Sequence, residues 1–99
     1  MIAQIVRFKS EMADEEVQKM YESRSPRYRA LPGLKQKIYL RFTETGEHGA
    51  VYLWESKKDI EEFRKSELSR TIPTAYQVKG DADIQLAEVA MTLRPMNVS

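Results

Sequence analysis

The chain has 99 residues, of which 41% are hydrophobic and 31% are charged, a composition typical of one globular domain and too apolar for a disordered chain. Sixteen basic residues against fifteen acidic ones leave a net charge of +1, so no strong field favours nucleic acid or an anionic membrane surface. The lack of cysteine excludes a disulfide framework and a thiolate site. Without a signal-like start or a run that could span a bilayer, we expect a soluble, cytoplasmic protein.

The first part of the chain predicts a strand followed by a helix. Residues 2–9 are mostly apolar and end at Ser10, which is typical of a buried strand. From Asp14, an N-cap candidate, acidic residues fill the first turn and apolar side chains recur at helical spacing. Because proline lacks an amide hydrogen, Pro26 predicts a break or kink, with a further turn as far as Ala30.

The remaining chain predicts a hairpin, a helix, a loop and a last strand. The hairpin strands are expected at residues 35–42 and 50–55, and the helix at 57–68. The loop is expected at 71–80 and the last strand at 83–94. A polar segment with two glycines joins the hairpin strands, Ser56 caps the helix, and Pro95 closes the last strand. The order of elements predicts an α+β, ferredoxin-like βαββαβ fold with a four-stranded antiparallel sheet and both helices on one face. We assign residues 1–95 to this single domain and residues 96–99 to a C-terminal tail.

Alternation along the central strands divides the sheet into an aliphatic and an aromatic face. Val51 and Leu53 share one face, whereas Tyr52 and Trp54 share the other. One layer of helices can bury only one face, and we expect it to bury the aliphatic one. The aromatic face, which also carries Tyr39, is then predicted to meet a second copy of the chain in a symmetric dimer that encloses a cavity.

Three short segments carry a resemblance to a known family. They are PRYRALPGL at residues 26–34, GAVYLW at 49–54 and MTLRP at 91–95. With the order of elements, they resemble the dimeric α/β-barrel proteins of the antibiotic-biosynthesis monooxygenase type, and within these the YdhR-like group. The resemblance implies a homodimer and, by analogy, oxidation of a small aromatic compound with no metal, flavin or other cofactor.

Eight residues are candidates for a site on the aromatic face. The candidate catalytic residues are Trp54, Tyr52 and Glu88, and the candidate substrate-binding residues are Tyr39, Lys37, Gln4, Tyr28 and Arg24. A deprotonated phenol, quinol or anthrone can pass an electron to dioxygen, so the protein need only bind the ring, favour its anion and exclude water. Trp54 matches a tryptophan that recurs on this strand in catalytic relatives. Glu88 is the candidate base, and the tyrosines and Lys37 would stabilise an oxyanion.

Each candidate also has a structural interpretation. The aromatic pair on the third strand is consistent with packing at a dimer interface. Glu88 is consistent with a charge that prevents unwanted pairing at an edge strand, or with an ion pair to Lys37. Lys37 is also consistent with a stripe of solvated basic residues on its strand, and Arg24 would complement the negative end of a helix dipole. Both faces of the strand that carries Gln4 are apolar, so alternation does not show which face of that strand points inward. His48, the only histidine, is expected to be exposed in the hairpin turn. Haem degradation, which needs a helical axial histidine in similar proteins, is therefore disfavoured.

The leading functional hypothesis is a cofactor-independent monooxygenase acting on a small aromatic compound. The alternatives are a non-catalytic module that binds a small hydrophobic ligand, and an isomerase or lyase that moves a proton without dioxygen. The sequence has no metal-ligand spacing, no glycine-rich phosphate loop and no serine–histidine pair, so metallohydrolase, nucleotide-binding and serine-hydrolase functions have no support.

Overall fold

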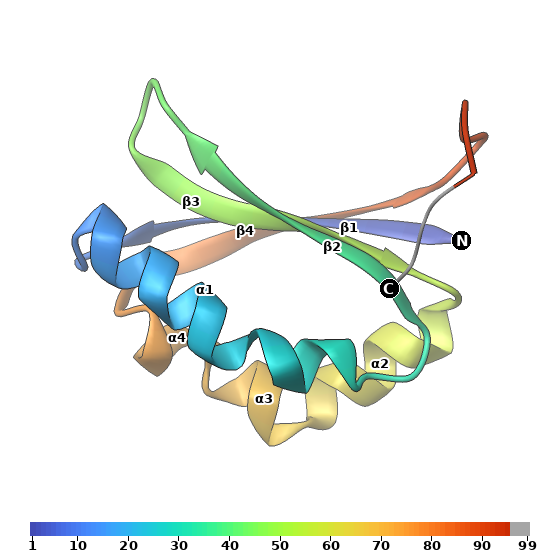
Figure 1. Cartoon of the computed structure of the whole chain (residues 1–99), viewed down its shortest axis with the longest axis horizontal. Coiled ribbons are helices and arrows are strands. Elements are labelled where there is room, and N and C mark those ends of the chain that lie inside the picture. Colours follow the sequence, from blue (N-terminus) through green and yellow to red (C-terminus); the bar gives the residue numbers. More distant parts are fainter. Residues whose placement is uncertain (96–99) are drawn as a thin grey trace.

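The computed structural model describes residues 1–95, and all of their helices lie on one side of a four-stranded antiparallel sheet (Figure 1). The elements are β1 (Ile2–Ser10), α1 (Asp14–Arg29), β2 (Leu34–Phe42), β3 (Glu47–Trp54), α2 (Lys57–Lys65), α3 (Glu67–Arg70), α4 (Ile72–Ala75) and β4 (Val78–Glu88). The strand order β2-β3-β1-β4 confirms the predicted ferredoxin-like fold. The predicted tail at 96–99 lies outside the described residues, and the assignment of 1–95 to one domain stays a prediction.

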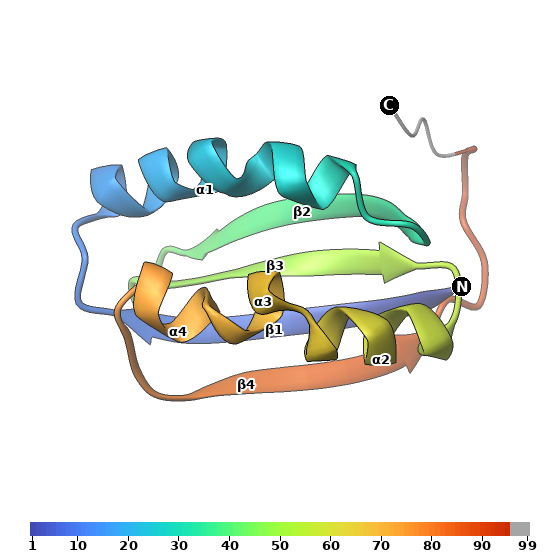
Figure 2. The same ribbon diagram turned by 90° about the horizontal axis from the view of Figure 1, so that it is seen from below.

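The helices form a single layer beneath the sheet. Figure 2 shows α1 alongside β2, while the segment from α2 to α4 crosses in front of β1. Among the described residues, no helix combines the length and the apolar character needed to cross a membrane.

Helix α1 runs without interruption through Pro26, so the predicted break is wrong. Proline leaves the carbonyl of Glu22 without its helical donor, and the hydroxyl of Ser25 donates to that carbonyl instead, at 3.0 Å. The helix also starts one residue earlier than expected, with Ala13 as its N-cap. The carboxylate of Glu16 accepts a hydrogen bond from the Ala13 amide at 3.2 Å, which is one half of a capping box.

The C-terminal half differs from the prediction at two boundaries. The second helical region divides at Ser66, whose hydroxyl accepts the amide hydrogen of Ser69 at 3.2 Å and so caps α3. The last strand is shifted towards the N-terminus. It pairs with β1 from Val78 onwards because Gly80, at a φ of 67°, lies near a shift in register rather than ending the strand. It ends at Glu88 because that residue pairs with Ile2, where β1 begins.

The helices cover the aromatic face of the sheet, which is the reverse of the prediction. Tyr52 and Trp54 are only 4% and 1% exposed, because rings from the helices, such as Phe63, pack against them. On the other face Ile38 is 49% exposed, and its cross-strand neighbour Val51 is partly exposed. The prediction that a second copy of the chain covers the aromatic rings is therefore wrong.

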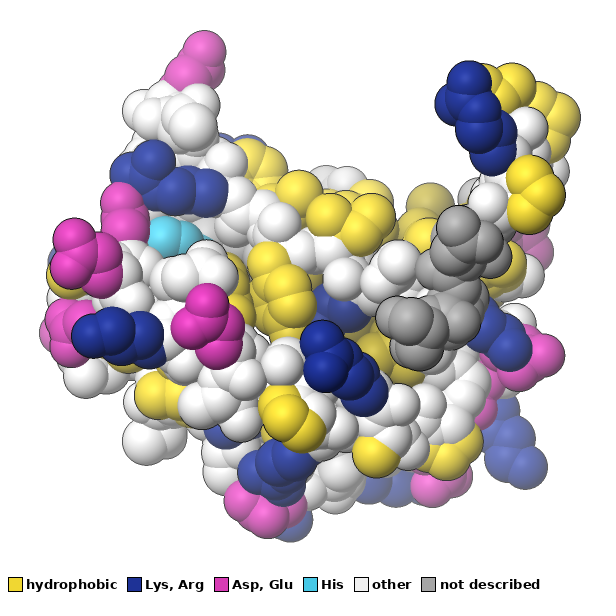
Figure 3. All heavy atoms as spheres, viewed as in Figure 1, with side chains coloured by type: hydrophobic (Ala, Val, Ile, Leu, Met, Phe, Trp, Pro, Cys, Tyr) yellow, Lys and Arg dark blue, Asp and Glu magenta, His cyan; other side chains and the backbone are white. Residues whose placement is uncertain are grey.

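The uncovered side of the sheet is apolar at its centre. We call it the open apolar face, and its aliphatic residues are Ile5, Ile38, Leu40, Val51 and Leu53. Figure 3 shows hydrophobic side chains gathered along the top of the molecule. The hairpin of β2 and β3 rises at one end of this surface and residues 89–95 rise at the other (Figure 1).

Candidate functional site

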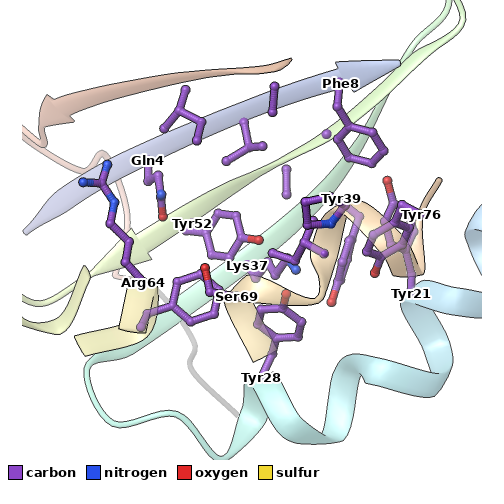
Figure 4. A pocket seen from close by; sticks show the side chains of 18 residues that line it. Gln4, Phe8, Tyr21, Tyr28, Lys37, Tyr39, Tyr52, Arg64, Ser69 and Tyr76 are labelled. Carbon is purple, nitrogen blue, oxygen red and sulfur yellow. The ribbon is translucent and has the colours of Figure 1, made fainter. Parts of the chain in front are cut away.

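A cavity of about 170 Å³ lies between the sheet and the helices (Figure 4). All five tyrosines of the chain line it, namely Tyr21 and Tyr28 from α1, Tyr39 from β2, Tyr52 from β3 and Tyr76 directly after α4. Apolar side chains such as Val6, Phe8 and Ile84 complete much of the wall. An apolar space with a few inward polar groups is the usual form of a small-molecule site.

Lys37 lies among three of these tyrosines. Its Nζ is 3.4 Å from the ring centroid of Tyr28, 4.4 Å from that of Tyr39 and 4.6 Å from that of Tyr52. The position follows from the sheet, because Lys37 pairs directly with Tyr52 across β2 and β3 and therefore shares its face. No hydrogen bond or ion pair joins this amine to any other residue within 1–95. The cavity thus holds a lysine amine without a counter-ion.

Burial changes the protonation of this amine. Desolvation, with a smaller effect from the positive charge of Arg24, lowers the pKa of Lys37 from 10.5 to about 6. The negative faces of the tyrosine rings act in the opposite direction, because they favour an ammonium ion. The lowered pKa makes the uncharged amine, whose lone pair is available to a ligand, accessible at neutral pH.

The tyrosine hydroxyls remain protonated and act as donors. Burial raises the pKa of Tyr39 to about 12 and that of Tyr52 well above its ordinary value of 10.0. The hydroxyls of Tyr21, Tyr28 and Tyr76 are buried and find no hydrogen-bond partner in the part of the chain that the structure describes. Buried polar groups usually have hydrogen-bond partners. Because these three hydroxyls have none among the described residues, each is free to bond to an oxygen atom of a bound molecule.

Gln4 and Trp54 are joined to each other. The indole Nε1 of Trp54 donates to Oε1 of Gln4 at 2.9 Å in a buried hydrogen bond. Gln4 lines the cavity, which settles the face of β1 that the sequence left open. Trp54 does not line it, and its ring stacks on that of Tyr52 at a centroid distance of 5.9 Å. The indole therefore supports the wall of the cavity from behind.

Arg24 and Glu88 lie outside the cavity wall. The guanidinium of Arg24 donates to the carbonyl of Leu68 at 2.7 Å and to Oγ1 of Thr71 at 3.1 Å, and so ties α1 to α3. Glu88 is exposed at the end of the edge strand β4. Two strands separate it from the strand of Lys37, a gap of about 14 Å at the usual strand spacing. The predicted ion pair between Glu88 and Lys37 is therefore wrong.

Tyr21 and Tyr76 are site residues that the sequence did not predict. Tyr21 follows Val17 by four positions, so helical spacing would have brought its ring to the covered side. Tyr76 directly follows the four-residue helix α4, which is too short for spacing to place the ring. The prediction of an exposed His48 is wrong, because β3 begins at Glu47 and the histidine is 4% exposed. Its Nε2 lies 3.2 Å from Oδ1 of Asp14. Within 1–95, no three histidine, aspartate or glutamate side chains are arranged to hold a metal ion.

Comparison with solved structures reveals the same fold elsewhere. SnoaB, a cofactor-independent oxygenase from Streptomyces nogalater, is 14% identical with a TM-score of 0.75, over 95% of this chain and 97% of that one. An antibiotic biosynthesis monooxygenase is 11% identical with a TM-score of 0.72, over 92% and 100% of the two chains. A dimeric ferredoxin-like protein of unknown function from Thermobifida fusca is 13% identical with a TM-score of 0.71, over 89% and 90%.

At the level of sequence, neither a protein-family model nor a curated protein matches the chain. The structural likenesses are all below 25% identity, so they establish the fold and not the activity. The YdhR-like group within the resemblance stays a prediction. The chain has the ferredoxin-like fold of the antibiotic-biosynthesis monooxygenase-type proteins, as its segments and element order predicted.

Proposed function

We propose that this protein is a cofactor-independent monooxygenase that oxidises a small, electron-rich aromatic compound in the cavity between its sheet and its helices. The observation that carries the proposal is the amine of Lys37, which lies without a counter-ion among three tyrosine rings. SnoaB, a protein of the same fold, is described as a cofactor-independent oxygenase. Fold alone does not determine activity, so the chemistry of the cavity has to support it.

The cavity supplies what such an oxidation requires. The uncharged amine of Lys37 accepts a proton from a phenol or an anthrone-like carbon acid, and the resulting ammonium ion stays beside the substrate anion. Hydroxyls such as that of Tyr28, which has no partner among the described residues, donate to the oxyanion. The anion then passes an electron to dioxygen, and recombination gives a hydroperoxide. Loss of water converts the attacked carbon, which is a ring C–H carbon of a phenol or the CH₂ carbon of an anthrone-like acid, to a carbonyl, so one oxygen atom enters the product and the substrate supplies the electrons.

The size of the cavity favours a small substrate. Its volume is about 170 Å³, and an apolar cavity of about 150 Å³ is known to hold one benzene ring. A single-ring phenol or quinol therefore fits the space better than a molecule with three fused rings.

We also propose that the protein is a homodimer, but with the open apolar face as its interface. Ile38 is 49% exposed on that face, and burying such a side chain stabilises an assembly by about 1.5 to 3 kcal/mol. Met91 and Leu93, at 79% and 81% exposed, lie on the segment that rises beside the same face. The protein from Thermobifida fusca with this fold is described as dimeric. A self-complementary contact would cover all of these side chains at once.

One observation favours a binding module instead of an enzyme. The residues that line the cavity include no carboxylate, and Glu88, the predicted base, is exposed on β4. Among the lining residues, Lys37 is then the only side chain that can act as a general base near neutral pH. If its amine binds an acidic ligand without consuming oxygen, the same cavity serves for sensing or carriage.

Oxygen uptake distinguishes the two functions. Purified protein would be incubated with single-ring quinols, phenols and anthrones, alongside Lys37→Met, Tyr52→Phe and, as a matched control, Lys35→Met. Lys35 is the neighbouring lysine of β2, and its Nζ lies 3.4 Å from Oε2 of Glu55. The proposal expects turnover that falls at least tenfold in Lys37→Met and persists in the control. Tight binding without oxygen uptake would support the binding module.

A further inference from the structure

The lysine in the cavity is a nucleophile as well as a base. We propose that Lys37 forms a Schiff base with small aromatic aldehydes that enter the cavity, an activity separate from oxidation. Three features of the geometry support this assignment: the amine has no ion-pair partner among the described residues, the walls around it are mostly apolar, and hydroxyl donors surround it. A desolvated lysine in an apolar pocket is the usual source of a Schiff-base amine.

The contrast with Lys35 shows why one lysine of β2 is suited to this chemistry and its neighbour is not. The side chain of Lys35 is 40% exposed, and its Nζ lies 3.4 Å from a carboxylate oxygen of Glu55. A solvated lysine is uncharged in only about one molecule in 2,500 at pH 7. Lys37 instead faces the rings of Tyr28 and Tyr52, where no carboxylate holds the proton.

Burial and the charged groups near Lys37 favour the uncharged amine, whereas the faces of the tyrosine rings favour the ammonium ion. The titratable and charged side chains on the packed elements are Arg24 and Tyr28 from α1, Tyr39 from β2, Tyr52 from β3, Arg64 from α2 and Tyr76 after α4. The arginines are cationic and the tyrosines neutral at pH 7, because burial raises the pKa of each tyrosine. Burial and Arg24 together lower the pKa of Lys37 to about 6. A free lone pair is therefore accessible at neutral pH.

The condensation balances without any oxidant or reductant. The lone pair of Nζ attacks the carbonyl carbon, and one of the two protons on the nitrogen then moves to the carbonyl oxygen to give a carbinolamine. A tyrosine hydroxyl donates a proton to the departing hydroxyl group, which leaves as water, while the nitrogen lone pair forms the C=N bond. The remaining N–H proton can return to the tyrosine. The iminium form of the product is stabilised by the ring faces of Tyr28, Tyr39 and Tyr52.

Reductive trapping tests the proposal. The whole chain would be incubated at pH 7 under argon with benzaldehyde and sodium cyanoborohydride, and the benzylated lysine located by mass spectrometry of its peptides. We expect a single fast modification at Lys37, at least about tenfold faster than at Lys35, because a far larger fraction of its amine is uncharged. Lys37→Met should lose the fast phase, and Lys35→Met should keep it.

Two results would overturn the proposal. One is modification spread evenly over the lysines of the wild-type chain, which requires no variant to fold. The other is a fast phase that survives in Lys37→Met. Because the experiment excludes oxygen, its outcome does not depend on whether the protein is a monooxygenase. A chain that oxidises quinols but is not trapped, or the reverse, would separate the two proposals.

Discussion

The two faces of the sheet are both apolar, but they carry different chemistry. The covered face combines aromatic rings with polar groups, as in Tyr52 and Lys37, whereas the open face is aliphatic at Ile38 and Val51. The tyrosine rings pack between the sheet and the helices, and the space that remains beside their hydroxyl ends is the cavity. Aliphatic side chains on a sheet suit flat packing against another sheet. Under the two proposals, ligand chemistry would belong to the covered face and assembly to the open one.

Substituting Trp54 should give the largest difference in the free energy of unfolding between a residue on the covered face and one on the open face. Trp54→Ala is expected to lower the free energy of unfolding by about 3 to 5 kcal/mol, because it empties a buried site and leaves Gln4 without its buried partner. Leu53→Ala, next to it but on the open face, should cost clearly less in the monomer. Urea denaturation followed by circular dichroism compares the two. Equal losses would contradict the assignment of the covered face.

Replacing the Lys37 amine should change how stability depends on pH. The pKa of Lys37 is 10.5 when solvated and about 6 in the folded chain, so between these values the unfolded state binds more protons. Lys37 therefore makes the wild-type protein more stable as pH rises from 6 to 10, by about 1.4 kcal/mol per pH unit. Above pH 10 tyrosines such as Tyr39, with a pKa raised to about 12, lower the stability again.

Lys37→Met removes the first of these effects, and the variant should be more stable than the wild type near pH 7. Free energies of unfolding from urea titrations between pH 6.5 and 9 give the two slopes. Parallel curves for the variant and the wild type would mean that the amine keeps its proton in the folded chain.

A charge on the open apolar face should weaken the proposed dimer. Ile38→Asp is expected to raise the dimer dissociation constant at least tenfold, or about 1.4 kcal/mol, and to leave the monomer folded. Leu86→Asp is a matched control. Leu86 is 42% exposed, but it pairs with Gln4 and therefore lies on the same face of the sheet as Gln4, not on the open apolar face. Sedimentation velocity measures both. Dissociation by Leu86→Asp alone would place the interface elsewhere.

The smallest effect is expected at the end of β4. Glu88→Gln should change the free energy of unfolding by no more than about 0.5 kcal/mol, as is usual for an exposed position, and should leave the oxygen-uptake rate within twofold. A tenfold loss of uptake would instead restore Glu88 as a catalytic base, brought to the cavity by another copy of the chain.

The order of elements could be predicted from the sequence because helical and strand periods differ along the chain. The division of the sheet into two faces could also be predicted, since Tyr52 and Trp54 alternate with Val51 and Leu53. Alternation cannot say which face the helices cover when both are apolar. That choice depends on rings such as Phe63, which packs against Tyr52 only in the folded chain.

Of the candidate site, the sequence predicted the residues on the strands better than their roles. Gln4, Lys37, Tyr39 and Tyr52 do line one cavity, because strand parity brings them to one face. The isolation of the Lys37 amine could not be predicted, since it depends on which carboxylates lie within reach. Tyr76 was missed because its helical turn is too short to show a clear period in the sequence.

The single indole of the chain has a practical consequence. Trp54 is the only tryptophan, and its ring stacks on that of Tyr52, which lines the cavity. Excitation energy absorbed by the tyrosines can transfer to this single indole, whose emission intensity and wavelength respond to the polarity around Tyr52. Intrinsic fluorescence therefore offers a label-free titration of any compound that enters the cavity, before its chemical fate is known.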